Sequence, residues 1–478
     1  MSQLEQAQRW EQETLSGFLL EETPEPTMPE VTRQKPFDEF ILKIHSRCNL
    51  ACDYCYMYEL RDQSWQDQPN SVMERTTLAT TALRIAEHVT EHDLEKVSII
   101  FHGGEPLLAD AVDPQYFEWS TKMFSSVVGE AISNVLKTTK PSLDEAQRIA
   151  EAQKGVIFLM QTNGTRITEE VAQKLQACGI RAGISIDGGH AEHDRHRIKR
   201  NGDGSYQEVR RGIKIINSGD YARTVFGGLL TVVNLENRPE RPDHLLWDLV
   251  VHRPPSLDFL FPLGTWEDPP DGLPAERIPY TQIPQKGENI DTPYADYLIK
   301  IFDVWYKHGR NGGMPPIRLF GAVINGLVGK PSNAEYLGLD PVGNIVIETD
   351  GTIKQIDSLK ATYEGADALG LTIFQPNALE AALNHEKTRH RQLGMAALST
   401  VCQSCPLVNV CGGGPYPTRY NHENQFKNPS VYCRDLWKLI EHIRHQLETD
   451  GVETILDSLA PNFKRIPKRV GRSSSVRL

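Results

Sequence analysis

The sequence predicts an α/β fold, because short apolar runs alternate with amphipathic stretches along its first half. The apolar runs are typical of strands in a parallel sheet and lie at 38–45, 97–102, 156–161, 181–186, 224–233 and 257–262. Helical periodicity follows each of them, at 74–91, 113–127, 142–153, 168–178, 206–217 and 243–251. Six such units predict a partial, TIM-like (β/α)6 barrel, whose reactive groups lie at the carboxyl ends of the strands.

Changes in composition divide the chain into four expected parts: an N-terminal extension at 1–36, the barrel at 37–310, a glycine-rich domain at 311–450 and a tail at 451–478. A proline-rich, acidic stretch at 264–292 is expected to link the first domain to a helix at 293–308. A second helix at 432–449 is expected to close the fold.

The composition restricts the class of protein and its partners. A net charge of −12 argues against nucleic acid as the main partner. No apolar run approaches the roughly 18 residues of a membrane span, and the N-terminus lacks the apolar segment of a signal peptide. Seven of the eight cysteines fall in two groups, which favours metal or cluster ligation in a reducing cytoplasm over disulfides. The eighth, Cys178, is expected to be a small core residue at a helix end.

The first group, Cys48-x3-Cys52-x2-Cys55, lies on the loop that leaves the first predicted strand. Three thiolates are one ligand short of a closed [4Fe–4S] cluster or a structural zinc site. Zinc or inert thiols are the alternatives, and His45 could supply a fourth ligand. Structural zinc prefers paired Cys-x2-Cys units, and only one is present here, so the spacing favours an open cluster with one iron free to bind another group.

This group resembles the signature of the radical S-adenosylmethionine (SAM) enzymes. The resemblance implies that the amino and carboxylate groups of SAM chelate the open iron. It also implies that reductive cleavage of SAM yields a 5′-deoxyadenosyl radical, which abstracts hydrogen from the substrate. Tyr54, just before the last cysteine, matches the family position that contacts SAM.

The second predicted strand ends in His102-Gly103-Gly104-Glu105-Pro106. A glycine pair is often only a turn, although glycine also lets the backbone approach a ligand closely. At this position the motif resembles the methionine-binding motif of the same enzymes. The resemblance implies that Gly103, Gly104 and Glu105 hold the amino group of SAM.

The next two strands end in Gln161-Thr162-Asn163-Gly164 and Ser185-Ile186-Asp187-Gly188, and ordinary turn chemistry could explain either motif alone. With His193-Asp194-Arg195-His196-Arg197 and Gly204-Ser205-Tyr206, they resemble the SPASM branch of the superfamily. That resemblance implies a SAM pocket that includes Gln161, Asn163, Ser185, Asp187 and Arg197. Ser185 is expected at the ribose and Arg197 at the carboxylate, which a guanidinium binds bidentately. A surface charge is the alternative for Arg197.

The second cysteine group is Cys402-x2-Cys405-x5-Cys411 followed by Cys433. Four thiolates close a ligand set for either [4Fe–4S] or zinc. Resemblance to the SPASM pattern favours an auxiliary [4Fe–4S] cluster. A full SPASM domain has seven cysteines, and here Ile356 and Pro415 stand where two of the other three are expected. The resemblance therefore implies two clusters in total, one that binds SAM and one auxiliary.

Asp357 follows the missing cysteine, at a position where formylglycine-forming relatives keep an aspartate as general base. A carboxylate can take the proton released when a substrate radical is oxidised. The alternative is a turn residue in Gln355-Ile356-Asp357-Ser358.

Within the SPASM branch the chain most resembles the FxsB-type peptide maturases, on Gly338-Leu339-Asp340-Pro341, Glu348-Thr349-Asp350-Gly351, Gln355-Ile356-Asp357-Ser358-Leu359-Lys360 and Cys411-Gly412-Gly413-Gly414-Pro415. The resemblance implies an enzyme that joins an aromatic ring carbon to a β-carbon in a ribosomally made precursor peptide, forming a cyclophane. It also implies a reducing partner such as flavodoxin or ferredoxin. The alternatives are a sulfatase-maturing (formylglycine-forming) enzyme, a thioether-forming maturase and, from a different class, a cluster-bearing scaffold without turnover.

Overall fold

The computed structural model of the chain describes residues 34–67, 71–273, 279–284, 291–309 and 313–450. The predictions for the N-terminal extension up to residue 33, and for the tail at 451–478, lie outside these ranges. Among the described residues, no helix combines the length and the apolar character needed to cross a bilayer.

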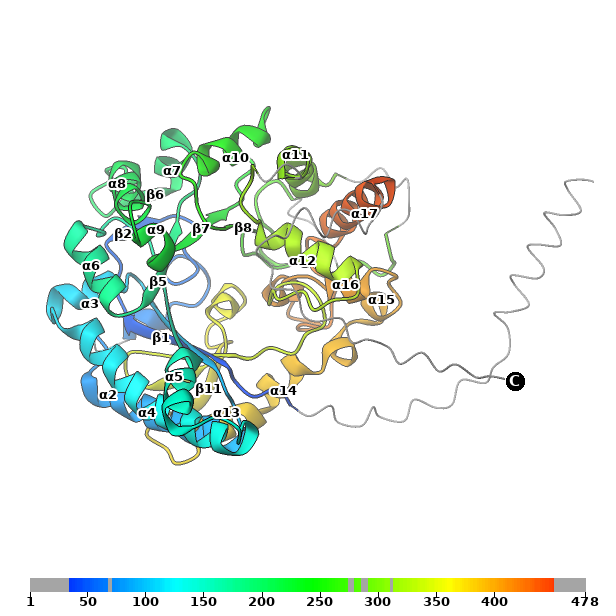
Figure 1. The fold of residues 1–478 in the computed structure, drawn as a ribbon. Coiled ribbons are helices and arrows are strands. Elements are labelled where there is room, and N and C mark those ends of the chain that lie inside the picture. The colour runs from blue at the N-terminus through cyan, green and yellow to red at the C-terminus, as the bar shows by residue number, and fades with distance from the viewer. Residues whose placement is uncertain (1–33, 68–70, 274–278, 285–290, 310–312, 451–478) are drawn as a thin grey trace, which may run out of the picture. The chain divides into compact units, whose positions relative to one another are not determined.

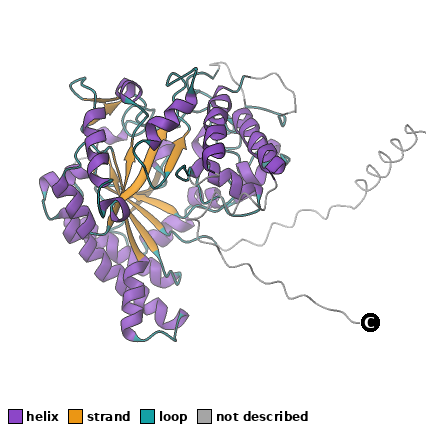
Figure 2. Cartoon of the chain, turned by 45° about the horizontal axis from the view of Figure 1, so that its top comes forward, coloured by secondary structure: helices purple, strands orange, loops and turns teal. Residues whose placement is uncertain are grey.

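The six predicted strands form parallel neighbours in one sheet, which confirms the barrel core (Figure 1). They are β1 (Glu39–His45), β3 (Val97–Gly103), β4 (Val156–Thr162), β5 (Ile180–Ser185), β7 (Phe226–Val232) and β8 (Leu257–Leu260). Alternate residues of β1 such as Phe40, Leu42 and Ile44 are fully buried. Figure 2 shows the strands fanned out at the centre with helices around them.

The predicted helices cover this sheet as α2 (Arg75–Glu91), α4 (Tyr116–Thr139), α5 (Glu145–Gly155), α6 (Glu169–Ala177), α8 (Tyr206–Ile216) and α10 (Pro242–Val250). Helix α4 extends twelve residues beyond the predicted end at 127. Its apolar face continues past Gly129 through Ile132, Val135 and Leu136, all buried, so packing overrides the interruption by glycine. Three short helices lie between these elements: α3 (Leu107–Val112), α7 (His190–His196) and α9 (Tyr221–Thr224).

The same sheet continues beyond β1 through β9 (Asn344–Ile347), β10 (Thr352–Lys354) and β11 (Ala368–Thr372). Strand β9 pairs in parallel with β1, with Leu42 opposite Ile347, and β10 and β11 then run antiparallel. A segment expected in the second domain therefore completes the free edge of the barrel sheet. Because β9 runs parallel to β1, the chain that follows β9 lies near the carboxyl end of β1.

The remaining elements include α11 (Pro293–Gly309) and α17 (Cys433–Asp450), close to the helices predicted at 293–308 and 432–449. Figure 1 places α11, α12 (Arg318–Leu327), α16 (Val408–Cys411) and α17 on one side of the sheet. Helix α17 contacts each of the other three, and α12 also contacts α16. The others are α13 (Ala378–Asn384), α14 (Glu386–Gln392), α15 (Thr400–Gln403) and the 3-10 turns η1 (Ser64–Asp67), η2 (Asp357–Ala361), η3 (Gly394–Ala397) and η4 (Tyr416–Arg419).

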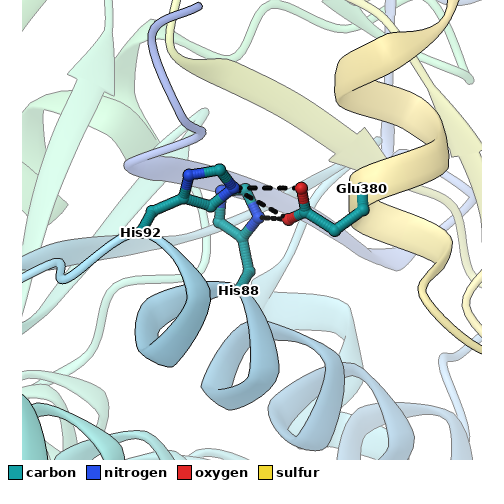
Figure 3. A group of neighbouring side chains, drawn as sticks. All are labelled: His88, His92 and Glu380. Carbon is teal, nitrogen blue, oxygen red and sulfur yellow. Dashed lines mark hydrogen bonds and ion pairs between the residues drawn. The ribbon is translucent and has the colours of Figure 1, made fainter.

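A three-residue cluster links α13 to the barrel helix α2 (Figure 3). His88 Nδ1 lies 2.5 Å from Glu380 Oε1, and His92 Nε2 lies 3.0 Å from both Glu380 oxygens. The buried amide of Phe37 donates to His88 Nε2 at 3.0 Å. Since that nitrogen accepts, a neutral His88 carries its proton on Nδ1 and donates it to Glu380. The cluster thus joins the start of the barrel, α2 and α13 by hydrogen bonds.

Candidate active site

The first cysteine group lies on a loop that leaves β1 and is held in shape by local pairing. Strand β2 (Leu50–Cys52) pairs antiparallel with β6 (Arg197–Lys199), which sets Cys52 opposite Arg197. The Cys55 amide donates to the Cys52 carbonyl at 3.1 Å. The Leu50 amide donates to Cys48 Sγ at 3.4 Å. The structure therefore places all three thiols on one short, braced segment, as predicted from the spacing.

The thiols of this loop strongly resist ionisation in the absence of a positive partner. Burial, together with the charges of Glu105, Cys52 and Cys55, raises the pKa of Cys48 to about 12. Burial likewise raises the pKa of Cys52 to about 11. Such a site forms thiolates only when a cationic metal centre binds.

The glycine pair at the end of β3 packs directly against residues 45–47, the segment that precedes Cys48. The Gly104 amide donates to the His45 carbonyl at 2.8 Å, and the Glu105 amide to the Arg47 carbonyl at 3.0 Å. Gly103 has φ +147°, and a Cβ there would lie 2.2 Å from the His45 carbonyl oxygen. A Cβ on Gly104 would lie 2.4 Å from the Arg47 oxygen. Only glycine permits this close pairing of the two segments.

Glu105 is fully buried and ties β3 to the end of β4. Its carboxylate accepts from Thr162 Oγ1 at 2.6 Å, from the Asn163 amide at 2.8 Å and from the Leu107 amide at 3.1 Å. A carboxylate offers about four acceptor positions, so the protein itself uses most of them. The predicted contact with the amino group of SAM stays a prediction.

The polar residues at the next two strand ends lie beside the cysteine loop or beside each other. Asn163 Nδ2 donates to Asn49 Oδ1 at 2.9 Å and lies 3.7 Å from Cys48 Sγ. Gln161 Nε2 donates to Ser185 Oγ at 2.8 Å. The carboxyl ends of β4 and β5 therefore present their predicted side chains at the same edge of the sheet.

Asp187, Tyr54 and Arg197 form one buried cluster. Asp187 Oδ2 accepts from the Tyr54 hydroxyl and, at 2.8 Å, from Arg197 Nε. The Arg197 guanidinium lies 5.5 Å from the centre of the Tyr54 ring. Burial alone would raise the pKa of Asp187, but Arg197 and then His193 hold it below its usual value. Arg197 is buried, so the surface-charge alternative for it is wrong.

Asp357 begins η2 and lies inside the barrel against β1. Its Oδ2 is 2.6 Å from Lys43 Nζ, which also lies 3.0 Å from Met57 Sδ and 3.5 Å from His102 Nδ1. Burial opposes ionisation of Asp357, but the positive charge of Lys43 holds its pKa below the usual range. Burial and the charge of Lys43 lower the pKa of His102 to about 4.

Sequence reasoning did not identify Lys43 or His102 as neighbours of Asp357. The available signal was a lysine at an inward position of the apolar run Phe40-Ile41-Leu42-Lys43-Ile44. A lysine in a buried strand needs a partner, which points to an acid elsewhere in the chain.

Asp357 belongs to a larger group of buried charged side chains. This group includes residues close to Ile356, which stands where a cysteine is expected. The acids are Asp62, Glu348, Asp357 and Asp367, and the cations are Lys43, Lys354 and Lys360. Lys360 lies 3.2 Å from Asp367, and Lys354 lies 3.4 Å from it. Burial raises the pKa of Glu348, and the group holds one more acid than lysine.

The second cysteine group surrounds a small apolar cavity at the start of α17. Cys402, Cys405, Cys411 and Cys433 line it together with apolar side chains including Leu407, Val408, Trp437 and Ile440. Burial raises the pKa of Cys411 to about 12, and the charges of Cys402 and Cys405 add to this shift. The structure therefore brings together all four cysteines predicted from the spacing. Cys178 lies elsewhere, at the end of α6, partly buried against the core as expected.

Comparison with known proteins identifies the class of this site. Residues 42–247 match the family model of the Radical SAM superfamily. The matched range holds the first cysteine group and every strand-end motif described above. The protein is thus an enzyme with a radical SAM domain, and the prediction of an α/β radical SAM barrel is confirmed.

Relatives of this chain include anaerobic sulfatase-maturating enzymes. The cysteine-type anaerobic sulfatase-maturating enzyme of Clostridium novyi is 25% identical over 418 residues, covering 85% of this chain and 95% of that protein. The serine-type enzyme of Bacteroides thetaiotaomicron is 20% identical over 424 residues, covering 86% and 90%. The solved structure of native anSMEcpe with bound AdoMet superposes with a TM-score of 0.62 at 22% identity, covering 86% of this chain and 98% of that one. At this identity the superposition establishes a common fold.

Proposed function

We propose that this enzyme uses SAM and two [4Fe–4S] clusters to modify a peptide. Cys48, Cys52 and Cys55 would hold the cluster that binds SAM. The residues proposed to hold SAM are Tyr54, Gly103, Gly104, Glu105, Gln161, Asn163, Ser185, Asp187 and Arg197. The observation that carries this proposal is that the loop with the three thiols lies beside the strand-end motifs of β3, β4 and β5, at one edge of the sheet.

When bound and reduced, these cofactors supply a 5′-deoxyadenosyl radical, which takes a hydrogen atom from a substrate carbon. The protein's own part is to fix SAM and to exclude competing reactions. Arg197 is suited to the SAM carboxylate because its guanidinium is already oriented by Asp187 and Tyr54. Asn163 is suited to the same pocket because it is fixed by Glu105 and lies beside Cys48.

Asp357 is proposed as the base that takes the proton released when the substrate radical is oxidised. Its Oδ1 makes no hydrogen bond within the described residues, although the atom is buried. An acceptor that is free in the protein can take a substrate proton. The Lys43 contact to Oδ2 keeps the carboxylate ionised while leaving Oδ1 available.

The product proposed first is a crosslink between an aromatic ring carbon and a β-carbon of a ribosomally made peptide. Two hydrogens leave the peptide: one as the atom abstracted by the radical, the other as a proton and an electron that restore aromaticity. The proton would go to Asp357 and the electron to the cluster at Cys402, Cys405, Cys411 and Cys433. A flavodoxin- or ferredoxin-type protein would exchange electrons with the enzyme. Support comes from the FxsB-like motifs and from the charged group that stands where the further cysteines are missing.

Oxidation of a peptide Cys or Ser to formylglycine is the second candidate. Relatives named for this activity align with this chain over nearly their whole length, which is the observation that favours it. The same base and the same two-electron balance would serve that reaction.

One experiment separates the two products. The genes on either side of the enzyme's gene are searched for a short peptide, the enzyme is co-expressed anaerobically with it, and the peptide is analysed by tandem mass spectrometry. A crosslink lowers the mass by about two units, suppresses fragmentation between the joined residues and leaves the peptide inert to an aminooxy probe. Formylglycine reacts with that probe. Absence of 5′-deoxyadenosine when the reduced enzyme is given SAM and peptide would contradict the shared proposal.

A further inference from the structure

Arg419 is a buried arginine enclosed by the glycines that follow Cys411. Its Nη2 donates to the carbonyls of Gly412 and Gly414 at 2.6 and 2.7 Å, and its Nε donates to Gly413 at 3.1 Å. The three glycines have φ of +60°, +84° and +75°, a backbone that turns their carbonyls toward the guanidinium. A Cβ on Gly413 would lie 3.0 Å from Arg419 Cζ, so glycine is needed for the fit.

No carboxylate balances this charge among the described residues: the partners of Arg419 are backbone carbonyls and the Tyr416 ring, 5.4 Å away. Arg391, at 5.9 Å from the same ring, instead pairs with Glu335 at 2.7 Å. A buried cation without an anion is costly, and carbonyl dipoles compensate it only in part. A negatively charged group near Arg419 would therefore lower the cost of burying its charge.

The second cysteine group can supply negative charge once its thiols are deprotonated by a metal centre. Gly413, whose carbonyl accepts from Arg419, lines the cavity that the four cysteines surround. Burial lowers the pKa of Arg419, and charge on Cys402 and Cys411 opposes that shift. A metal centre held by four thiolates carries net negative charge, and a [4Fe–4S] centre becomes more negative when it accepts an electron. A fixed positive charge beside it favours the reduced form.

We propose that Arg419 is the built-in counter-charge of the auxiliary cluster and raises its reduction potential, so that this cluster accepts the electron released by the peptide. The inference rests on the proposed auxiliary cluster and deepens its role as electron acceptor. Arg419 acts as a positioning residue through the cluster and does not contact the substrate. The electron removed from the peptide reduces the cluster by one unit, and a flavodoxin- or ferredoxin-type partner then reoxidises it.

The test compares Arg419→Gln with Arg419→Lys in the full-length chain. Both are made in a background in which Cys48, Cys52 and Cys55 are alanine, so that the signal comes from one cluster. The reduction potential is measured by titration monitored by electron paramagnetic resonance, with iron counted in the same samples. Gln removes the charge, whereas Lys keeps it but loses the planar fork.

In the Gln variant, reduction of the cluster is expected to become about tenfold less favourable, which corresponds to about 59 mV for one electron. The Lys variant is expected to stay near the unsubstituted potential. The matched control is the double variant Arg391→Gln/Glu335→Gln, which removes a neutral pair beside the same Tyr416 ring and is expected to leave the potential unchanged.

The inference is also decided by whether each variant keeps its cluster. Loss of the cluster from the Gln variant alone supports it, because charge is then required to hold an anionic centre. An unchanged potential in the Gln variant, an equal fall in both variants, or loss of the cluster from both overturns it. In the unsubstituted protein, zinc in place of iron at this site would overturn the auxiliary cluster itself, and this inference with it.

Discussion

Lys43 Nζ and Asp357 Oδ2 lie 2.6 Å apart inside the barrel, with side chains only 1% and 7% exposed. The pairing of β9 with β1 is what brings these two residues together, since Asp357 follows β9 and Lys43 lies on β1. Neither charge has ready access to water, so each depends on the other. Removing either partner alone should therefore lower the stability of the folded protein.

Replacing Lys43 with Met is expected to destabilise the folded protein by about 3–5 kcal/mol at neutral pH, because it leaves a buried carboxylate unpaired. Asp357 has a lowered pKa in the folded protein. Its contribution to stability is therefore present above the unfolded-state pKa of about 3.9 and is lost as the pH falls through the folded-state value. Chemical denaturation at several pH values should show the cost shrinking in acid, and a Lys43→Met/Asp357→Asn double variant should recover much of it. A cost that does not change with pH would exclude an ionised Asp357.

Asp357→Asn is expected to separate radical formation from product formation. The amide cannot take a proton under these conditions. SAM should still be cleaved to 5′-deoxyadenosine in the presence of peptide, while modified peptide falls by roughly 10²–10⁴-fold. Full product formation by the Asn variant would identify Asp357 as a structural turn residue, since Asn suits the same turns.

Arg197→Ala is expected to weaken SAM binding by about 1.5–3 kcal/mol, or about 10- to 150-fold in dissociation constant. The single variant also leaves Asp187 without its main cation. The control is therefore Arg197→Ala/Asp187→Asn, which removes both charges and should bind SAM no more tightly than the single variant. Binding is measured by calorimetric titration of the reconstituted protein. Recovery of affinity in the double variant would show that Arg197 acts only by neutralising Asp187.

Anaerobic reconstitution is expected to load about eight irons per chain, from two four-iron clusters. Replacing Cys48, Cys52 and Cys55 together with Ala should halve the iron and abolish cleavage of SAM. Replacing Cys402 and Cys405 should halve the iron but leave some cleavage. A value near twelve irons would reveal a third site that the cysteine groups do not account for.

The barrel could be predicted from sequence because its strands are buried runs and its helices have long apolar faces, both local patterns. Strands β9, β10 and β11 could not, since each has only three to five residues and the three join the sheet through the pairing of β9 with β1, far away in the chain. The cysteine groups were found because their spacing is itself the signal. The contacts of Asp357 with Lys43 and of Arg419 with the glycine carbonyls depend on three-dimensional placement, and only a lone lysine in an apolar strand and a run of three glycines hinted at them.

The linkage of His88, His92 and Glu380 bears on how iron in this enzyme should be counted. Two imidazoles and a carboxylate would ordinarily capture excess ferrous or nickel ions during reconstitution or affinity purification. Here the Phe37 amide already occupies the His88 Nε2 lone pair, so Nδ1 keeps its proton and is closed to a metal ion unless that buried bond breaks. These three side chains should therefore hold little iron, and a chelator wash should remove what they do hold. The iron that remains after the wash can be assigned to the thiol sites.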